Sequence, residues 1–303
     1  MKKIIIMCLI TVICFYCETS NSAQTRQLRI IAFGAHPDDC ELKVGGVAAM
    51  WAMKGHKVKF VSATNGDIGH AKEAGGPLAR RRAAEVKKAA EILGIETEVL
   101  DIHDGELMPT LENRRAFVKL IREWKADIVI AHRPNDYHPD HRYTGTGILM
   151  QDAAFMVTVP HFCPETPHLP RNPVFLYMSD NFQKPNPFNP DIVVGIDSVF
   201  DKKTDAIWQL ESQIESLWVK GDFEVVSPIP KDEPERGKRK TDLKNMIAKR
   251  ASAIADKYRN KLIDLYGAEK AKQIKFAEAF EICEYGRQPT AAELKALFPF
   301  FDN

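Results

Sequence analysis

Two short runs of the sequence combine histidines with carboxylates at spacings that suit hydrolytic chemistry. The first is His36-Pro37-Asp38-Asp39, and the second extends over residues 132–141, much later in the chain, and ends in His138-Pro139-Asp140-His141. Imidazole and carboxylate are ligands that suit Zn²⁺ in catalytic sites, where three protein ligands leave one position open for water. A divalent ion held in this way acidifies its bound water and stabilises an oxyanion. The two runs therefore predict a metal-dependent hydrolytic site.

The spacing within the first run indicates different roles for neighbouring side chains. His36 and Asp39 are three residues apart, and Pro37 favours the start of a helix, so both side chains can face one point. His141, near the expected start of a later helix, is the candidate for a third ligand. Because Asp38 and Asp39 are adjacent, we expect one of them to bind the metal and the other to accept a proton from the water.

His138 and Asp140 form a second pair within the later run. A carboxylate fixes the tautomer of an imidazole and raises its basicity, which suits a general acid or a partner for an oxyanion. A single His-Pro-Asp-Asp run is common in turns, whereas two such runs that follow buried strands favour a metal site. The other histidines lack a spacing to carboxylates that indicates a site, and we interpret them as surface or core residues: His56, His70, His103, His132, His161 and His168.

Both runs follow stretches that predict buried strands. Predicted strands and helices alternate from residue 28 onward, with strands at 28–35, 57–63, 97–102 and 126–131 and helices at 44–54, 78–93 and 111–124. This alternation predicts an α/β fold with a Rossmann-like, mostly parallel sheet and helices on both of its faces. In such sheets the functional groups gather beyond the carboxyl ends of the strands, which is where both runs lie.

The alternation ends after residue 170. The pattern there predicts strands at 174–178 and 192–196 and helices at 202–217 and 241–266. Residues 226–240 are polar and rich in proline, which indicates an exposed loop. This loop contains a basic cluster, Arg236, Lys238, Arg239 and Lys240. The cluster indicates either an anionic partner or, because acidic residues adjoin it, an ordinary solvated segment.

Composition limits the class of protein. The chain has 303 residues, a formal net charge of +1 and 45% hydrophobic residues, as in ordinary globular proteins. A nucleic-acid partner is not expected, because binding to phosphates usually requires a basic surplus. No dinucleotide-binding fingerprint follows the first strand and no nucleophile elbow is present, which argues against a nicotinamide enzyme and a serine hydrolase. We expect one domain over residues 24–303, with a divergent helical part from about residue 200.

Residues 1–23 have the layout of a secretory signal peptide. Two lysines precede an apolar run over residues 4–17, and small residues follow it as candidates for cleavage. This run is shorter than the roughly 20 residues of a membrane span, so we expect a mature form without one. Export to the periplasm or the extracellular space is expected, with a lipid anchor on Cys14 or Cys17 as the weaker alternative. The other cysteines predict buried or free thiols, with one disulfide as the alternative: Cys40, Cys163 and Cys283.

Together, the two runs resemble the PIG-L (LmbE-like) family of metal-dependent deacetylases. The resemblance rests on Ala35-His36-Pro37-Asp38-Asp39-x-Glu41 with Gly45-Gly46, and on His138-Pro139-Asp140-His141. Between them, Thr64-Asn65-Gly66-Asp67-Ile68-Gly69 is similar to a Thr-x-Gly-Glu-x-Gly loop of the family, with Asp in place of Glu, and Arg82-x-x-Glu85 matches the following helix. The match extends over residues 28–155 and fades beyond Pro160, where Ser212-Gln213 and the segment 277–280 are similar to later family features.

The resemblance implies a zinc-dependent hydrolase that removes an N-acetyl group from an N-acetylglucosamine-like amino sugar or glycoconjugate, by attack of metal-bound water. By matched position, His36, Asp39 and His141 are expected to bind Zn²⁺ or another divalent ion such as Fe²⁺. Asp38 is expected to act as the general base. His138, oriented by Asp140, is expected to stabilise the oxyanion or to protonate the leaving amine.

The resemblance also implies that Arg82 and Asp67 bind the substrate. The alternatives are a surface ion pair of Arg82 with Glu85 and a turn formed by Asp67. Asp104, which precedes a glycine, is expected to form a turn or to line the pocket. Two other functions stay open, a glycan-binding module with an inactive metal site and an amidase that acts on non-sugar amides.

Overall fold

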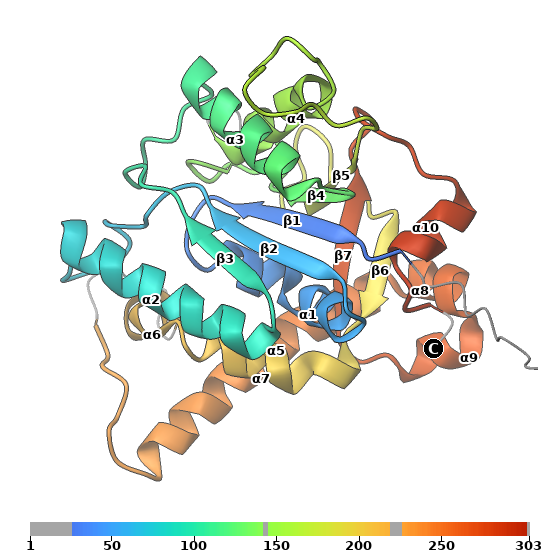
Figure 1. The fold of residues 1–303 in the computed structure, drawn as a ribbon. Coiled ribbons are helices and arrows are strands. Elements are labelled where there is room, and N and C mark those ends of the chain that lie inside the picture. The colour runs from blue at the N-terminus through green and yellow to red at the C-terminus, as the bar shows by residue number, and fades with distance from the viewer. Residues whose placement is uncertain (1–25, 142–144, 219–225, 302–303) are drawn as a thin grey trace, which may run out of the picture.

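A seven-stranded sheet forms the centre of the protein (Figure 1). The computed structural model describes residues 26–141, 145–218 and 226–301. Five strands run parallel in the order β3-β2-β1-β4-β5, β7 pairs antiparallel with β5, and β6 pairs antiparallel with β7 at the edge. The strands are β1 (Arg29–Gly34), β2 (Lys57–Ser62), β3 (Glu96–Val99), β4 (Ile128–Ala131), β5 (Val174–Met178), β6 (Ile192–Gly195) and β7 (Ala277–Ile282).

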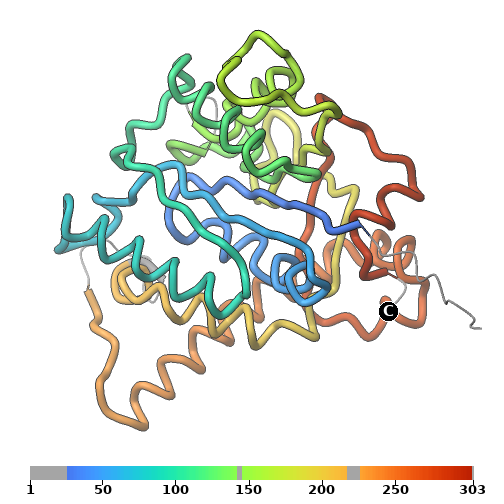
Figure 2. Tube along the Cα trace, in the orientation of Figure 1, coloured from blue at the N-terminus to red at the C-terminus, as the bar shows by residue number. Residues whose placement is uncertain are grey.

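Helices cover both faces of the sheet (Figures 1 and 2). On one face, α1, α2, α5 and α7 pack against Ile30 and Ala32 of β1, and on the other face α3 and α4 pack against Ile31 and Phe33. Strands covered on both faces must be apolar throughout, which explains their continuous hydrophobic sequences. The helices are α1 (Asp39–Met53), α2 (Gly75–Leu93), α3 (Leu111–Trp124), α4 (Thr146–Met156), α5 (Phe200–Ile207), α6 (Glu211–Gln213), α7 (Glu235–Lys257), α8 (Arg259–Tyr266), α9 (Ala268–Gln273) and α10 (Ala291–Leu297), with a 3₁₀ turn η1 (Asp197–Val199) and a π-helical turn η2 (Ile214–Trp218).

Local sequence signals set the limits of these helices. α2 ends at Gly94, whose φ of 77° lies in the left-handed region that glycine adopts at little cost. Thr110 precedes α3 as its N-cap residue, and its hydroxyl accepts a hydrogen bond from the Asn113 amide and so caps the first turn. The predicted α/β class, with a Rossmann-like sheet and helices on both faces, is confirmed.

Several predicted limits are wrong in the second half of the chain. The helix predicted over 202–217 is interrupted after α5, and the one predicted over 241–266 is interrupted at Tyr258, between α7 and α8. α7 already begins at Glu235, inside the segment predicted to be a loop. The part after residue 200 is also not wholly helical, because β7 returns to the central sheet.

Some predictions fall on residues outside the described part of the chain. The predicted signal peptide over residues 1–23, with Cys14 and Cys17, lies there. Among the described residues, no helix is both long enough and apolar enough to cross a membrane. The three remaining cysteines, Cys40, Cys163 and Cys283, are buried and free.

Candidate active site

The site lies where β1 and β4 run side by side and their following loops diverge. β1 and β4 are neighbours in the sheet although β2 and β3 lie between them in sequence, so their carboxyl ends form a topological switch point. The first polar run leaves β1 through Gly34, where a Cβ atom would lie 2.8 Å from Asp39 Cβ. A glycine at this position therefore lets the start of α1 fold back over the end of the strand.

Asp39 is the centre of the site. Its Oδ2 atom lies 3.5 Å from His36 Nδ1, 3.5 Å from His141 Nε2 and 3.2 Å from His132 Nε2. The same oxygen accepts a hydrogen bond from the His36 backbone amide at 2.8 Å, which fixes the carboxylate relative to the turn. Residues from two distant loops thus meet around one oxygen atom, and the predicted convergence of His36, Asp39 and His141 is observed.

His141 is held by a second carboxylate behind it. Its Nδ1 lies 3.0 Å from Asp136 Oδ2, while its Nε2 faces Asp39 and is buried without a hydrogen-bond partner among the described residues. Asp136 also accepts a hydrogen bond from the His138 amide. An imidazole with one nitrogen bound to a carboxylate and the other free is the usual arrangement of a metal ligand.

His36 shows the same arrangement with its nitrogens exchanged. Its Nε2 lies 3.0 Å from Asp104 Oδ1 and 3.5 Å from Asp140 Oδ2, so Nδ1 is the atom that faces Asp39. Asp140 has a left-handed backbone (φ 66°), which Asp tolerates better than most residues, and its carboxylate accepts the amides of Gly105 and Leu107. This carboxylate therefore braces His36 against the 104–107 loop.

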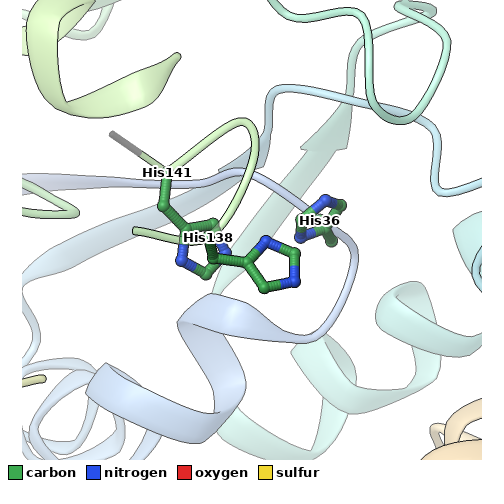
Figure 3. A group of neighbouring side chains, drawn as sticks. All are labelled: His36, His138 and His141. Carbon is green, nitrogen blue, oxygen red and sulfur yellow. The ribbon is translucent and has the colours of Figure 1, made fainter. Parts of the chain in front are cut away.

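His138, which lies beside His36 and His141 in Figure 3, is exposed, whereas the other two are half-buried. Its ring centroid lies 5.3 Å from that of His36 and 4.4 Å from that of His141, so the three rings form a triangle. Its Nδ1 lies 2.8 Å from the Pro139 carbonyl oxygen. The predicted orientation of His138 by Asp140 is not what the structure shows, because the carboxylate of Asp140 contacts His36 and two backbone amides.

These donors fit a divalent metal ion. Potential ligand atoms lie within 4.8 Å of one another in three overlapping groups: His36, His138 and His141; Asp39, His132 and His141; and His36, Asp104 and Asp140. The first two groups share His141, and the predicted set takes His36 from the first group and Asp39 from the second. Buried nitrogens without partners, His141 Nε2 and His132 Nε2, are the atoms that a bound cation would satisfy.

The charges of the site depend on these close contacts. Burial would raise the pKa of Asp39, but the imidazoles of His141 and His132 hold it well below its usual range. Burial opposes protonation of His141, yet Asp39 and Asp136 raise its pKa to about 9. Burial, together with the charge of His141, lowers the pKa of His132 to about 4. These contacts therefore favour the ionised form of Asp39, the protonated form of His141 and the neutral form of His132.

Asp38 differs from Asp39 in its surroundings. It precedes α1 as the N-cap residue but makes no capping hydrogen bond, and its Oδ2 lies 3.4 Å from Arg82 Nη2. Burial raises the pKa of Asp38, while Arg82 lowers it and Asp39 raises it further. A carboxylate at the edge of the cluster with a raised pKa is suited to accept a proton.

Arg82 lies behind Asp38 instead of facing the solvent. The residue is 2% exposed and donates to the backbone carbonyls of Gly66 and Pro37. A Cβ atom at Gly66 or Gly69 would lie 2.3 Å or 2.5 Å from Arg82 Nη1, which explains the glycines of this loop. Arg82 thus contacts Asp38, and the predicted substrate contact is not seen in the structure. The alternative, a surface ion pair of Arg82 with Glu85, is not seen either, because Glu85 pairs with Arg81.

Asp67 also contacts the protein itself. Its Oδ2 lies 2.8 Å from His103 Nδ1 and its Oδ1 accepts the Asp104 amide. Asp104 in turn contacts His36. Asp67 therefore supports the loop behind His36, and the predicted substrate contact of Asp67 is not seen in the structure.

Two residues of the site, His132 and Asp136, have no assigned role in the sequence prediction, and Asp104 was expected only to form a turn or to line the pocket. His132 was interpreted as a surface or core residue, yet it is buried beside Asp39. Its position directly after β4 was the available signal, since Ala131 is the last residue of that strand. Asp136 and Asp104 lie in polar loops, and only the fold shows that they face His141 and His36.

Comparisons with known proteins agree with this geometry. The PIG-L family, described as GlcNAc-PI de-N-acetylase, matches residues 31–151, which include the whole cluster. A diacetylchitobiose deacetylase from Thermococcus kodakarensis is 32% identical over 203 residues, 63% of this chain and 72% of that protein. A 4-oxalmesaconate hydratase from Pseudomonas putida is 27% identical over 213 residues, 67% of this chain and 80% of that protein.

A solved structure shares the fold. The N,N'-diacetylchitobiose deacetylase from Pyrococcus horikoshii superposes with a TM-score of 0.63 at 22% identity, covering 87% of this chain and 88% of that one. At this identity the likeness establishes the common architecture and leaves the chemistry to be argued from the site.

Proposed function

The chain belongs to the PIG-L family, and on this premise we propose that it is a metal-dependent N-deacetylase acting on an N-acetylglucosamine-like amino sugar or glycoconjugate. The observation that supports the proposal most is the pair of imidazoles, His36 and His141, that each turn one nitrogen to Asp39 and the other to a separate carboxylate. We propose zinc as the metal, because two imidazoles and one carboxylate are a donor set that it favours in open catalytic sites.

The residues around the ligands supply the remaining parts of an amide hydrolysis. When bound, a divalent ion supplies positive charge that acidifies water and polarises the carbonyl oxygen. Asp38 takes a proton from the attacking water as the bond between the water oxygen and the carbonyl carbon forms. Arg82 holds Asp38 at this position from behind.

The exposed His138 lies on the open side of the cluster, where the acetyl group must enter. Its Nδ1–H faces the Pro139 carbonyl oxygen, so with a proton on both ring nitrogens its Nε2–H donates a hydrogen bond to the substrate carbonyl oxygen as that atom gains negative charge. The proton on Asp38 passes to the amine nitrogen when the carbon–nitrogen bond breaks. One amide and one water thus give one acetic acid and one amine, which become acetate and an ammonium group when a proton passes from the acid to the amine, with no other reactant required.

Acetate release from N-acetylglucosamine and N,N'-diacetylchitobiose tests the proposal. The zinc-loaded protein is compared with the same protein after a chelator, and with the chelated protein after zinc is restored. We expect acetate release that the chelator abolishes and zinc restores. Release that the chelator leaves unchanged would remove the metal from the mechanism. Binding of the sugars with no acetate release would favour the glycan-binding module, and release only from non-sugar amides would favour the amidase.

A hydratase is a second candidate, because one relative with that activity aligns over 80% of its own length. The same base and metal would serve to add water across a conjugated carbon–carbon double bond. Incubation with an unsaturated, carboxylated enol or keto acid separates the two functions. Loss of the ultraviolet absorbance of the conjugated system, without acetate release from any sugar, would favour the hydratase over the deacetylase.

We further propose that the protein is exported, from the signal-peptide layout of residues 1–23. Expression with its own leader and intact-mass measurement of the secreted or periplasmic product would test this. We expect a mass that corresponds to loss of the leader. A full-length mass in the cytoplasmic fraction would contradict export, and an added diacylglyceryl mass would support the lipid anchor.

A further inference from the structure

α7 carries two sets of basic residues with different partners. Toward its beginning, Lys240 lies 2.7 Å from Asp205 and Lys244 lies 2.6 Å from Asp201, both on α5. Arg236 lies 3.6 Å from Glu211 of α6. The ion pairs of Arg236, Lys240 and Lys244 therefore hold the first half of α7 against α5 and α6.

The second half of α7 is different. Lys249, Arg250 and Lys257 form no ion pair with any residue in the described part of the chain. Lys249 and Arg250 lie three and four residues after Met246, and Lys257 lies two turns further along the same face. One face of the helix thus presents three unpaired cations.

This face forms one wall of a groove of about 580 Å³. The opposite wall consists of Lys43 on α1 and the loop Ser179–Asn181 that follows β5. Lys43 donates through Nζ to the Ser179 carbonyl oxygen at 2.9 Å. We call this space the basic groove, defined by Lys43, Lys249, Arg250, Lys257, Tyr258 and the 179–181 loop.

The one carboxylate that lines the basic groove is already neutralised. Asp180 accepts two hydrogen bonds from Arg133, each 2.9 Å long, in a bidentate pair. It therefore cannot balance the four cations of the groove. Unpaired cations that line one concave space favour an anionic ligand, because they concentrate positive potential there.

The basic groove adjoins the proposed catalytic cluster. Lys43 follows Asp39 by four residues on α1, one helical turn or about 6 Å along the axis. Burial lowers the pKa of Lys43, and the negative charges of Asp136, Asp39 and Asp180 oppose this shift. Two of these carboxylates, Asp136 and Asp39, belong to the cluster. Arg133, which holds Asp180, directly follows His132 in sequence. The groove and the cluster are thus connected through Lys43 on α1 and through the pair of Arg133 with Asp180.

We propose that the basic groove binds an anionic group, phosphate or carboxylate, carried by the amino-sugar substrate. The inference rests on the proposed deacetylase function and narrows its substrate class to acidic glycoconjugates. The groove's concave shape and its closeness to the cluster favour a group on the substrate over an extended polyanion, which would need a continuous basic surface.

The test compares three sugars and two matched variants. N-acetylglucosamine is the neutral substrate, N-acetylglucosamine 1-phosphate carries a phosphate, and N-acetylmuramic acid carries a carboxylate. The groove variant is Lys249→Gln/Arg250→Gln. The control variant is Lys240→Gln/Lys244→Gln, which removes the same charge from the same helix outside the groove.

We expect wild type to prefer at least one anionic sugar in kcat/KM. In the groove variant the ratio of anionic to neutral kcat/KM should fall about tenfold, since charge-assisted contacts are lost, and in the control variant it should stay near wild type. The preference should also weaken as salt screens the groove. No preference in wild type, or equal losses in both variants, would overturn the inference.

A binding measurement separates this inference from the proposed function. Isothermal titration of N-acetylglucosamine 1-phosphate and N-acetylmuramic acid into each protein needs no turnover. If no sugar yields acetate, the deacetylase proposal fails, while binding that weakens in the groove variant alone would still support the anionic subsite. If acetate is released but wild type binds the anionic sugars no better than N-acetylglucosamine, the subsite fails and the deacetylase stands.

Discussion

At the scale of single residues, the site separates two adjacent aspartates by what surrounds them. Asp39 faces three imidazoles and has a lowered pKa, whereas Asp38 faces Arg82 and has a raised pKa. One is therefore suited to stay ionised beside a cation, and the other to exchange a proton.

Replacement of Asp38 by Asn tests this separation. We expect Asp38→Asn to keep its metal and to lose activity by about 10²–10⁴-fold, the usual contribution of a general base. Metal content by mass spectrometry and acetate release on the same sample are the measurements. Asp39→Asn is the comparison, and it should lose metal. A metal-free Asp38→Asn protein would show that the two roles were exchanged.

Asp136 provides a second prediction, because it binds the ring nitrogen of His141 opposite to the one that faces Asp39. Asp136→Asn should weaken metal affinity about 10–100-fold, the usual effect of removing the partner of a ligating histidine. Competition with a chromophoric chelator measures this affinity. Asp152→Asn, a surface carboxylate paired with Arg114, is the control and should leave the affinity unaltered. An Asp136→Asn affinity equal to wild type would place His141 outside the ligand set.

Sequence alone indicated the residues whose types and order are unusual, and it missed those that only packing brings into place. His36, Asp39 and His141 stood out because histidines and carboxylates recur after strands. Asp136 did not, and Asp104 was expected only as a turn or pocket-lining residue, since an aspartate in a polar loop has the same local pattern whether or not it faces an imidazole. Arg82 and Asp67 were assigned to the substrate by the resemblance alone, which does not give the direction of a side chain in this chain.

At the scale of elements, a buried ion pair from β7 and α5 forms hydrogen bonds with backbone groups in the middle of α1. Glu278 of β7 accepts the amides of Gly46 and Val47 at 2.8 Å each, and Lys203 of α5 donates to the Leu42 carbonyl and to Glu278. In a regular helix the Gly46 amide and the Leu42 carbonyl pair with each other. A Cβ at Gly46 would lie 2.9 Å from Ile196 Cγ2, so glycine is required for this approach.

Glu278→Gln should therefore be strongly destabilising. Removal of one partner leaves the 4%-exposed Lys203 as a buried charge without its carboxylate, for which the typical cost is about 3–5 kcal/mol. Urea unfolding at neutral pH gives the free energy. The double variant Glu278→Gln/Lys203→Met should recover part of the loss. A double variant that is less stable than Glu278→Gln would show that the charge pair is not the source.

The capping box of α10 predicts a dependence of stability on pH. The Thr290 amide, followed by Arg171, lowers the pKa of Glu293 to about 2. A lowered pKa in the folded state gives stability that is present above the unfolded value near 4.5 and is lost as pH falls through about 2. Wild type should thus be more stable than Glu293→Gln at pH 7, and the difference should shrink below pH 4.5. Unfolding temperatures measured from pH 7 to pH 2 test this, and a constant difference would contradict it.

The alternating first half of the chain was the easier part of the fold to predict. Its strands are buried on both faces and its helices have clear stops such as Gly94, so pattern and structure agree. β7 was not predicted, because its polar Glu278 and Glu281 interrupt the apolar run, and only the tertiary contacts of these residues explain them. The start of α7 was mistaken for a loop since its basic residues are stabilised by acids on α5 and α6.

At the scale of the whole molecule, the proposed catalytic residues come from the first half of the chain, between residues 36 and 141, and the sheet order brings them together at one point. The second half contributes α7, which lies over α1 beside them. The PIG-L match covers the first of these parts, whereas the basic groove depends on the second.

In the proposals above, the residues that break the amide bond lie at the start of α1, and most of the residues that select the substrate lie on α7. A chimaera that keeps residues up to the end of β5 and takes its remaining helices from a relative would be expected to cleave the same bond in a different molecule. Substrate specificity can therefore change through substitutions in α7 alone, while the histidines of the catalytic cluster stay the same.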